Sequence, residues 1–454
     1  ARLAQVLLAE LGLAGRGRDA FYSRAEQEQI DHVLRAALTR EEWVKTGHNS
    51  GYFDDTIIER HLGVRLDPHV DQILVHRLVD SELPHSLAFV GSYFTDVGAW
   101  KSKHTATEAR SDRELWAYNA VDCVVTARTV GQLWKLMNLR NQREVYLLDR
   151  KVQEACREMH EQGMYVDEPV RARTEATYLQ RIEWKRLALT ELARQFGMPP
   201  DFNPNSVQQT AGLLFDRLGL APVTETLLGD PSTEDEALRE LMLGALNPKV
   251  RRFIGELRLL RKGVKFRSTN LRLAAEYGED GLWIMGDGRV HSSFNAHVPK
   301  SGRTSSSNPN LQNINRKLRR IYRAQDGRKL VACDMDGLEL RYVSARSRDP
   351  IFEPAFIRGD DVHALTAALI YEDRFLREPK GSPDWEAMRD YTKRLEYALI
   401  YLAQLPTVHE TICSAEDDDG NFVYPDMPLR VTRRNYRVFW QAHPAIREDA
   451  DRLI

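Results

Sequence analysis

The chain has 454 residues, which suggests about three domains. Its composition is that of a globular protein, with 42% hydrophobic and 29% charged residues and a mean hydropathy of −0.48. No apolar run approaches the roughly 20 residues of a membrane span, so we expect no membrane partner. The four cysteines form no C-x-x-C pair, which argues against a disulfide framework or a structural zinc site and favours the cytoplasm.

The charge of the chain is unevenly distributed. The formal net charge is −2, which by itself does not indicate a nucleic-acid-binding protein. Between Lys300 and Arg348, however, 12 lysines and arginines stand against 4 acidic residues. A basic stretch of this density predicts a surface that binds phosphate, although a solvated face is the usual explanation of a charge run.

The first part of the chain alternates between two kinds of pattern. Residues 25–38 have helical periodicity, and the short apolar run at residues 72–75 predicts a strand within a mixed α/β region that extends to about residue 138. Residues 139–196 are almost purely helical, with a break at residues 163–169 where glycine ends one helix and proline opens the next.

The rest of the chain changes from helices to strands and back. Asn203 to Ser206 caps a predicted helix at residues 207–218, residues 221–248 resemble a loop, and residues 250–276 predict a basic helix. Three short strands are predicted next, at residues 282–285, 289–294 and 329–334. Helices return after residue 360, and residues 404–429 predict an elaborated hairpin with an acidic turn.

An acidic residue ends the last of these strands. The apolar residues 330–333 precede Asp334, and a carboxylate at the exposed end of a buried strand can hold a divalent metal against a phosphate. Taken alone, an aspartate in this position is more often a turn residue or a helix cap.

An irregular polar segment lies upstream. Residues 301–314 combine Arg303 with several hydroxyls and with the amides of Asn310, Gln312 and Asn313. Such side chains suit hydrogen bonding along a nucleic-acid backbone and minor groove. The alternative is a loop whose polar side chains satisfy its own turns.

A third pattern lies further downstream. Arg389, Lys393, Tyr397 and Tyr401 recur every four residues and therefore share one helix face. Two cations followed by two aromatic rings can bind a triphosphate at one end and stack on a base at the other.

Together these motifs resemble the bacterial DNA polymerase I family (family A), with features closer to phage members. Residues 334–341 resemble polymerase motif A, and Arg389 to Tyr401 resemble motif B of the fingers helix. Residues 302–314 match the primer-template segment, residues 202–206 resemble the start of the thumb, and residues 361–363 resemble the fingers segment that meets the nucleotide.

The resemblance implies a role for each matching residue. Asp334, helped by the Met335 carbonyl, would bind two magnesium ions, and Lys393 would also protonate the pyrophosphate leaving group. Glu339 would exclude a ribose 2′-hydroxyl. The residues expected to bind the nucleotide are Met335, Glu339, His363, Arg389, Lys393, Tyr397 and Tyr401, and those expected to line the DNA duplex are Arg303, Asn310, Gln312 and Asn313.

The chain departs from the family pattern in several places. The family usually has glycines where Ala398 and Leu402 stand. Glycine at the second position normally eases the motion of the fingers, so we expect Leu402 to affect how the fingers open. Asp336 replaces a serine. The second palm carboxylate, usually in a later His-Asp-Glu hairpin, does not occur after Tyr401, and the acidic turn at residues 417–419 comes too early to replace it.

The first 125 residues resemble a second enzyme, a DEDD-type 3′–5′ proofreading exonuclease. Residues 46–54 and 117–122 resemble its second and third motifs, with Asp54 and Asp122 as metal ligands and Tyr118 orienting the attacking water. No Asp-x-Glu of the first motif precedes Asn49, so the domain is either truncated or a non-catalytic DNA-binding shell. Truncation at both ends of the chain is the hypothesis we favour.

The resemblance implies a multidomain α/β and α+β fold: an RNase H-like exonuclease domain followed by a right-hand polymerase with an incomplete palm. The expected divisions are exonuclease at 1–138, the start of the polymerase domain and the thumb at 139–280, palm with motif A at 281–357 and fingers with motif B at 358–454. We expect a template-directed DNA polymerase with proofreading, acting on primer-template DNA and dNTPs with Mg²⁺ or Mn²⁺, in the cytoplasm of a bacterial host if it is phage-encoded. The alternatives are mainly an exonuclease, or a polymerase-like DNA-binding protein without chemistry.

Overall fold

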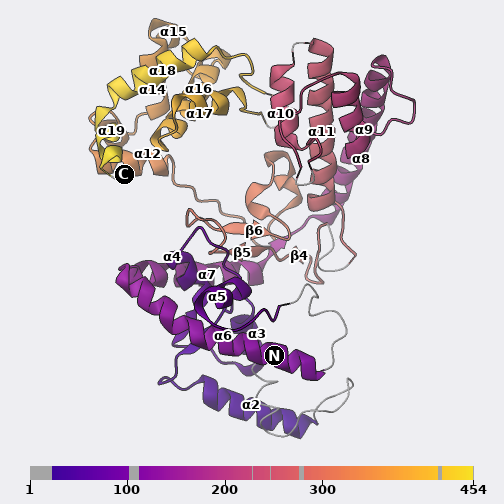
Figure 1. Ribbon diagram of the computed structural model, residues 1–454. Helices are drawn as coiled ribbons and strands as arrows, with labels where there is room; N and C mark the ends of the chain where they lie inside the picture. Colours follow the sequence, from indigo (N-terminus) through magenta and orange to yellow (C-terminus); the bar gives the residue numbers. More distant parts are fainter. Residues whose placement is uncertain are drawn as a thin grey trace. The chain divides into compact units, whose positions relative to one another are not determined.

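The computed structural model describes residues 23–101, 112–226, 229–245, 247–275, 281–417 and 422–452 (Figure 1). The chain forms two compact units, each of which is discontinuous in sequence. Unit 1 comprises Ala1–Arg171 and Thr269–Ala324, and unit 2 comprises Ala172–Ser268 and Gln325–Ile454.

Unit 1 opens with short strands between helices. The elements are α2 (Arg24–Leu38), β1 (Lys45–Gly47), α3 (Asp54–Leu62), β2 (His69–Asp71), α4 (Gln72–Val79), α5 (Leu87–Phe94), α6 (Asp112–Leu139) and α7 (Arg143–Gln162). β1 and β2 are parallel, with Lys45 opposite His69. A core that includes Leu74, Val90 and Met137 joins α4, α5 and α6.

The strand predicted at residues 72–75 is wrong, because these residues open helix α4. The Asp71 carboxylate accepts a hydrogen bond from the backbone N–H of Ile73 at 3.2 Å and so caps this helix. All but one of the residues of α4 are buried, so the helix shows no amphipathic period that would distinguish it from a buried strand.

The remainder of unit 1 contains two antiparallel strand pairs. β3 (Met164–Tyr165) pairs with β4 (Arg289–Val290), and β5 (Ser293–Asn295) pairs with β6 (Ser305–Ser307). The 3₁₀ turns η2 (Leu311–Asn313) and η3 (Arg316–Ile321) follow. The run predicted at 289–294 is therefore two strands, and residues 282–285 form no strand beyond a single bridge between Leu282 and Leu273.

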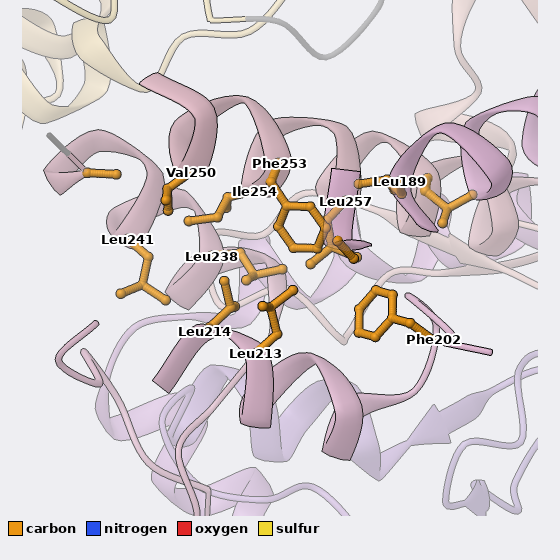
Figure 2. Packing of buried hydrophobic residues seen from close by; sticks show 13 residues of the cluster. Leu189, Phe202, Leu213, Leu214, Leu238, Leu241, Val250, Phe253, Ile254 and Leu257 are labelled. Atoms are coloured by element: carbon orange, nitrogen blue, oxygen red, sulfur yellow. The ribbon is translucent and has the colours of Figure 1, made fainter. Parts of the chain in front are cut away.

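The first half of unit 2 is a helical bundle (Figure 2). Its elements are α8 (Glu168–Gln195), α9 (Val207–Ala211), the π-helical turn η1 (Gly212–Arg217), α10 (Asp235–Gly244) and α11 (Pro248–Asn270). Phe202, Leu213, Leu238 and Phe253 point toward one another in its core. The helices predicted at 207–218 and 250–276 are confirmed, the second ending at Asn270, whereas α10 contradicts the loop predicted at 221–248.

The second half of unit 2 is also helical, as predicted. It contains α12 (Leu338–Ser347), α13 (Phe352–Arg358), α14 (Val362–Tyr371), α15 (Asp373–Arg377), α16 (Pro383–Ile400), α17 (Leu405–Cys413), α18 (Leu429–Ala442) and α19 (Pro444–Asp451). Leu340, Phe352, Leu395 and Phe439 belong to one buried cluster that links these helices. The hairpin predicted at 404–429 is wrong in its first part, where α17 forms, and only one antiparallel bridge, between Glu416 and Phe422, flanks the predicted turn among the described residues. Residues 418–421 of its acidic turn lie outside the described residues.

The strand predicted before Asp334 is also wrong. Residues 329–335 have no regular secondary structure and are exposed, with Val331 at 83%. A strand is held by hydrogen bonds to a neighbouring strand, and no strand in the described parts of the chain pairs with this segment. None of the described helices is long and apolar enough to cross a bilayer.

Candidate functional site

Helix α16 carries the four-residue stripe predicted from the sequence. Ser382 caps the helix by accepting a hydrogen bond from the Trp385 N–H, and Pro383 occupies its first turn. Its buried side comprises Trp385, Met388, Tyr391, Thr392, Leu395, Glu396 and Leu399. Arg389 and Tyr397 are half-buried and Lys393 is exposed, so the stripe runs along the accessible side and ends at the exposed Tyr401.

Arg389 is tied to the start of α14. Its Nε donates a hydrogen bond to Asp361 Oδ2 at 2.7 Å, and the other oxygen, Asp361 Oδ1, caps α14 through the Ala364 N–H at 3.1 Å. Burial works to raise the pKa of Asp361, but the hydrogen bonds from Arg389 and Ala364 outweigh it and hold this pKa below its ordinary value. The guanidinium is thereby fixed at one end of the stripe.

A second pair links the same two helices, this time with the basic residue on α14 and the acidic residue on α16. His363 Nδ1 on α14 contacts the Glu396 carboxylate on α16, which is completely buried. Burial raises the pKa of Glu396, although the imidazole of His363 works in the other direction. The His363 ring lies 6.0 Å from the Tyr397 ring, so the pair also positions a predicted site residue beside the stripe.

Two cavities adjoin the aromatic end of the stripe. One of about 530 Å³ is lined by Lys393, Tyr397 and Tyr401, among others, and one of about 370 Å³ is lined by Glu339 of α12, Tyr342 and again Tyr401. Burial raises the pKa of the Tyr397 phenol, and the Glu339 carboxylate adds to the shift. Glu339 therefore lies within electrostatic reach of Tyr397.

Asp334 and Met335 lie immediately before this site. Both are exposed and precede Gly337, whose φ of 61° begins α12. Mg²⁺ is commonly held by one or two carboxylates together with substrate phosphates, so Asp334 and a main-chain carbonyl are a chemically suitable partial donor set. The described residues contain no group of three or more histidine, cysteine or acidic side chains that could hold a metal.

The polar segment at residues 301–314 is partly engaged in its own turns. Asn310 Oδ1 accepts hydrogen bonds from Ser306 Oγ at 3.0 Å and from the Asn313 N–H at 3.2 Å, and Gln312 Nε2 donates to Thr304 Oγ1 at 2.9 Å. Arg303, Asn310, Gln312 and Asn313 are nevertheless all exposed. The segment is thus both internally braced and accessible, and it belongs to unit 1.

The predicted nuclease residues also lie in unit 1. Asp54 is the first residue of α3 and is half-buried. Asp122 is buried on α6, where it accepts a hydrogen bond from Trp100 Nε1 at 2.8 Å and lies 3.4 Å from Lys101 Nζ. The same ammonium stands 5.6 Å from the ring centre of Tyr118, one helical turn earlier. Tyr118 and Asp122 are therefore brought together around Lys101.

Three residues of these sites were not predicted. Lys101 and Glu396 have no motif around them, and their roles follow only from contacts with residues far along the chain. Asp71 is completely buried and accepts hydrogen bonds from the backbone N–H of Asn49 at 2.7 Å and of Gly51 at 3.0 Å. It thereby fixes the loop that leads to Asp54, and its position directly after an apolar strand residue was the available signal.

Comparison with known proteins bears on the polymerase-like part of the chain. The model of the family described as DNA polymerase family A matches residues 173–417, which is just over half of the chain. The chain belongs to DNA polymerase family A. The family A match covers the bundle, Asp334 and the complete α16 stripe.

Relatives of this family A chain include two bacterial enzymes. It is 29% identical over 357 residues to the thermostable DNA polymerase I of Thermus filiformis, covering 77% of this chain and 38% of the relative. It is 29% identical over 398 residues to DNA polymerase I of Pseudomonas aeruginosa, covering 83% and 41%. The chain thus spans about two fifths of the length of these curated relatives.

A solved structure shares the fold. The POL domain of Pol1 from M. smegmatis, in complex with DNA primer-template and dNTP, superimposes with a TM-score of 0.64 at 18% identity, covering 95% of this chain and 68% of that one. The polymerase fold expected from the sequence is confirmed. The exonuclease fold, the phage-like character and the truncation stay predictions.

Proposed function

We propose that this chain carries the nucleotide-binding part of a template-directed DNA polymerase that extends a primer 3′ end with deoxynucleotides. The α16 stripe carries the proposal, because it combines a fixed guanidinium, an exposed ammonium and two aromatic rings beside two cavities, one of which Glu339 also lines. The known fold supports it, since the structural neighbour is a polymerase complexed with primer-template and dNTP.

In this proposal the residues of α14 and α16 bind the triphosphate. Arg389, held by Asp361, and Lys393 supply positive charge to the phosphates, and His363, whose ring lies 6.0 Å from the Tyr397 ring, would contact them as well. Lys393 is exposed and can deliver a proton to the departing pyrophosphate. Tyr397 packs on the incoming sugar and base, and Tyr401 stacks near the template base.

Magnesium belongs to the same proposal, with manganese as a substitute. Asp334 and the Met335 carbonyl would hold it, and its charge would stabilise the phosphoryl transfer from the nucleotide to the primer hydroxyl. The chain's own contribution is to position the phosphates and to exclude a ribonucleotide through Glu339. Arg303, Asn310, Gln312 and Asn313 would contact the duplex.

A binding experiment tests the nucleotide site separately from turnover. The chain is mixed with a dideoxy-terminated primer-template, and the stability of the complex is measured as the next templated dNTP is added. Lys393→Ala should weaken the dNTP effect about tenfold or more, because a charge-assisted phosphate contact is worth about 1.5–3 kcal/mol. The control Arg377→Ala removes a charge from the exposed surface of α15. If the correct dNTP stabilises the parent complex no more than a mismatched one, the proposal is wrong.

We also propose a 3′–5′ exonuclease function for unit 1, for which a separate observation argues. Tyr118 and Asp122 both face Lys101, so a phenol and a carboxylate lie close to the same cation. In an exonuclease of this kind the phenol would orient the attacking water and the carboxylate would be an anionic metal ligand. Asp122→Ala should remove the degradation of single-stranded DNA, whereas Asp96→Ala, which alters an exposed ion pair with Arg128, should not. A parent protein that never degrades such DNA would favour the non-catalytic DNA-binding alternative.

A further inference from the structure

Helix α18 presents a face of arginines that the proposed chemistry does not use. Four of its residues, Arg430, Arg433, Arg434 and Arg437, are exposed, and the helix contains no acidic residue. Residues three, four and seven apart share one helix face, so these guanidinium groups form a stripe about 10 Å long.

The opposite face of α18 fixes this stripe in place. Thr432, Asn435 and Phe439 are buried, and Asn435 Nδ2 donates a hydrogen bond to the Tyr391 hydroxyl of α16 at 3.1 Å. The arginine stripe therefore lies on a helix that is anchored directly to the helix of the nucleotide site, within the same unit.

The stripe is electrostatically unfavourable for the isolated protein. Arg434 pairs with Glu372 at 3.0 Å, but no acidic group in the described residues lies within ion-pair distance of Arg430, Arg433 or Arg437. Like charges three and four residues apart destabilise a helix, and Arg430 stands in the first turn, where the helix dipole disfavours a cation. These charges therefore have no evident role in holding the fold together.

We propose that the arginine face of α18 binds the phosphate backbone of the single-stranded template ahead of the polymerase site. This inference rests on the proposed polymerase function. Arginine binds phosphate oxygens through paired hydrogen bonds, and a stripe of this length matches two or three consecutive phosphates of one strand. In the proposed function the template is single-stranded beyond the base that faces the incoming nucleotide, so its unpaired continuation would leave the site at α16, the helix to which Asn435 ties α18.

The test compares primer-templates that differ only in the length of the unpaired template. The triple variant Arg430→Gln, Arg433→Gln, Arg437→Gln is measured against the parent on an overhang of two nucleotides or so and on one of about 12, within the range of site sizes of single-strand-binding domains. On the long overhang the slope of log affinity against log salt should fall by about 2, and affinity near 0.15 M salt should fall about tenfold or more. On the short overhang both quantities should stay unchanged.

A matched control removes three exposed positive charges elsewhere. Lys135, Arg143 and Lys151 are exposed on α6 and α7 of unit 1, and their replacement by glutamine should not produce the overhang-dependent loss. Equal losses in both triple variants, or a loss that is independent of overhang length, would overturn the proposal. So would unchanged DNA binding by the α18 variant, which would instead point to an acidic protein partner.

The outcome can be separated from a failure of the polymerase function. On the short overhang the α18 variant should still form the dNTP-dependent complex, which also shows that it is folded. If the parent binds the long overhang more tightly through these arginines but never responds to dNTP, the proposed template-binding surface is supported and the proposed nucleotide site is contradicted.

Discussion

Asp361 joins two functions in one carboxylate, because it caps α14 and holds Arg389. Its pKa is lowered, so its contribution to stability is present above the pKa of an unfolded aspartate, near 3.9, and is lost as the pH falls through the folded value. Asp361→Asn keeps a capping oxygen but loses the ion pair. We expect it to lower the free energy of unfolding by about 1 kcal/mol at pH 7 and by less near pH 3.

Urea unfolding of parent and variant at both pH values measures this difference. Asp390→Asn, which alters an ion pair with Arg394 at 2.8 Å on the same helix, is a control for a general loss of surface charge. An Asp361→Asn effect of the same size at both pH values would contradict a charge-dependent role.

Glu339 and Tyr397 make separable predictions about the sugar of the nucleotide. Glu339→Ala should raise ribonucleotide insertion, because the longer side chain would collide with a 2′-hydroxyl. Tyr397→Phe should increase discrimination against dideoxynucleotides about 10-fold to 100-fold. A dideoxynucleotide lacks the 3′-hydroxyl, and a polar partner that is left unpaired costs about 1–3 kcal/mol, an interaction that the phenol hydroxyl of Tyr397 can take up. Single-nucleotide insertion with paired deoxy, dideoxy and ribo substrates measures both. A parent that already discriminates like the Phe variant would mean that Tyr397 is not at the sugar.

The residues of one helix were predictable from the sequence, and the contacts between helices were not. Arg389, Lys393, Tyr397 and Tyr401 share a face because helical periodicity places them there. The partner of His363 is Glu396, 33 positions away, and no local pattern distinguishes this glutamate from a surface one. Its complete burial is a consequence of packing between α14 and α16.

At the scale of elements, helices were predicted better than strands. The bonds of α11 and α16 lie within each helix, so their periodicity is sufficient evidence. Residues 72–75 and 330–333 are short apolar runs that periodicity cannot assign, and a strand also needs a partner. In the first case the Asp71 cap made a helix, and in the second no neighbouring strand is present among the described residues.

The end of α16 has an unusual backbone. Leu402 follows the helix with φ of 60°, and the Ala403 N–H bonds back to the Ala398 carbonyl at 3.1 Å. Glycine usually occupies this left-handed position, since a Cβ costs about 1–2 kcal/mol there. Leu402, at a position where the family resemblance implies a glycine, therefore holds a strained backbone conformation.

Two substitutions at Leu402 separate the backbone from the side chain. Leu402→Ala removes the side chain and keeps the strain, whereas Leu402→Gly removes both. The Gly variant should be more stable than the Ala variant by about 1 kcal/mol, after allowance for the greater freedom of glycine in the unfolded chain. Thermal or urea unfolding measures the difference, and equal stabilities would show that Leu402 is not strained.

At the scale of the whole molecule, the residues of the two proposed chemistries belong to different units. Asp54, Tyr118 and Asp122 lie in unit 1, and Asp334, Glu339 and the α16 stripe lie in unit 2. The primer-template segment at residues 301–314 belongs to unit 1, although it precedes Asp334 by only 20 residues or so. Motifs that are neighbours along the chain therefore do not always belong to the same compact unit.

This separation predicts that each chemistry can be removed without the other. In the complete protein, Asp334→Asn should lower primer extension about 100-fold or more, because a charged metal ligand is worth several kcal/mol to the transition state. Binding of primer-template should change little, since the basic residues from Arg316 to Arg328 remain, and degradation of single-stranded DNA should be unaffected. Asp54→Ala or Asp122→Ala should do the reverse, abolishing degradation while correct nucleotides are inserted at the parental rate.

Extension, degradation and DNA affinity are measured on the same preparations of the complete protein. Near-normal extension by Asp334→Asn would remove the metal-binding assignment, whereas degradation by both nuclease variants at the parental rate would remove the assignment of unit 1. A variant that lost both activities together would show that the two units depend on one another for folding or for DNA binding. The thermal unfolding of each variant distinguishes these two cases, because a folding dependence lowers the unfolding temperature and a DNA-binding dependence does not.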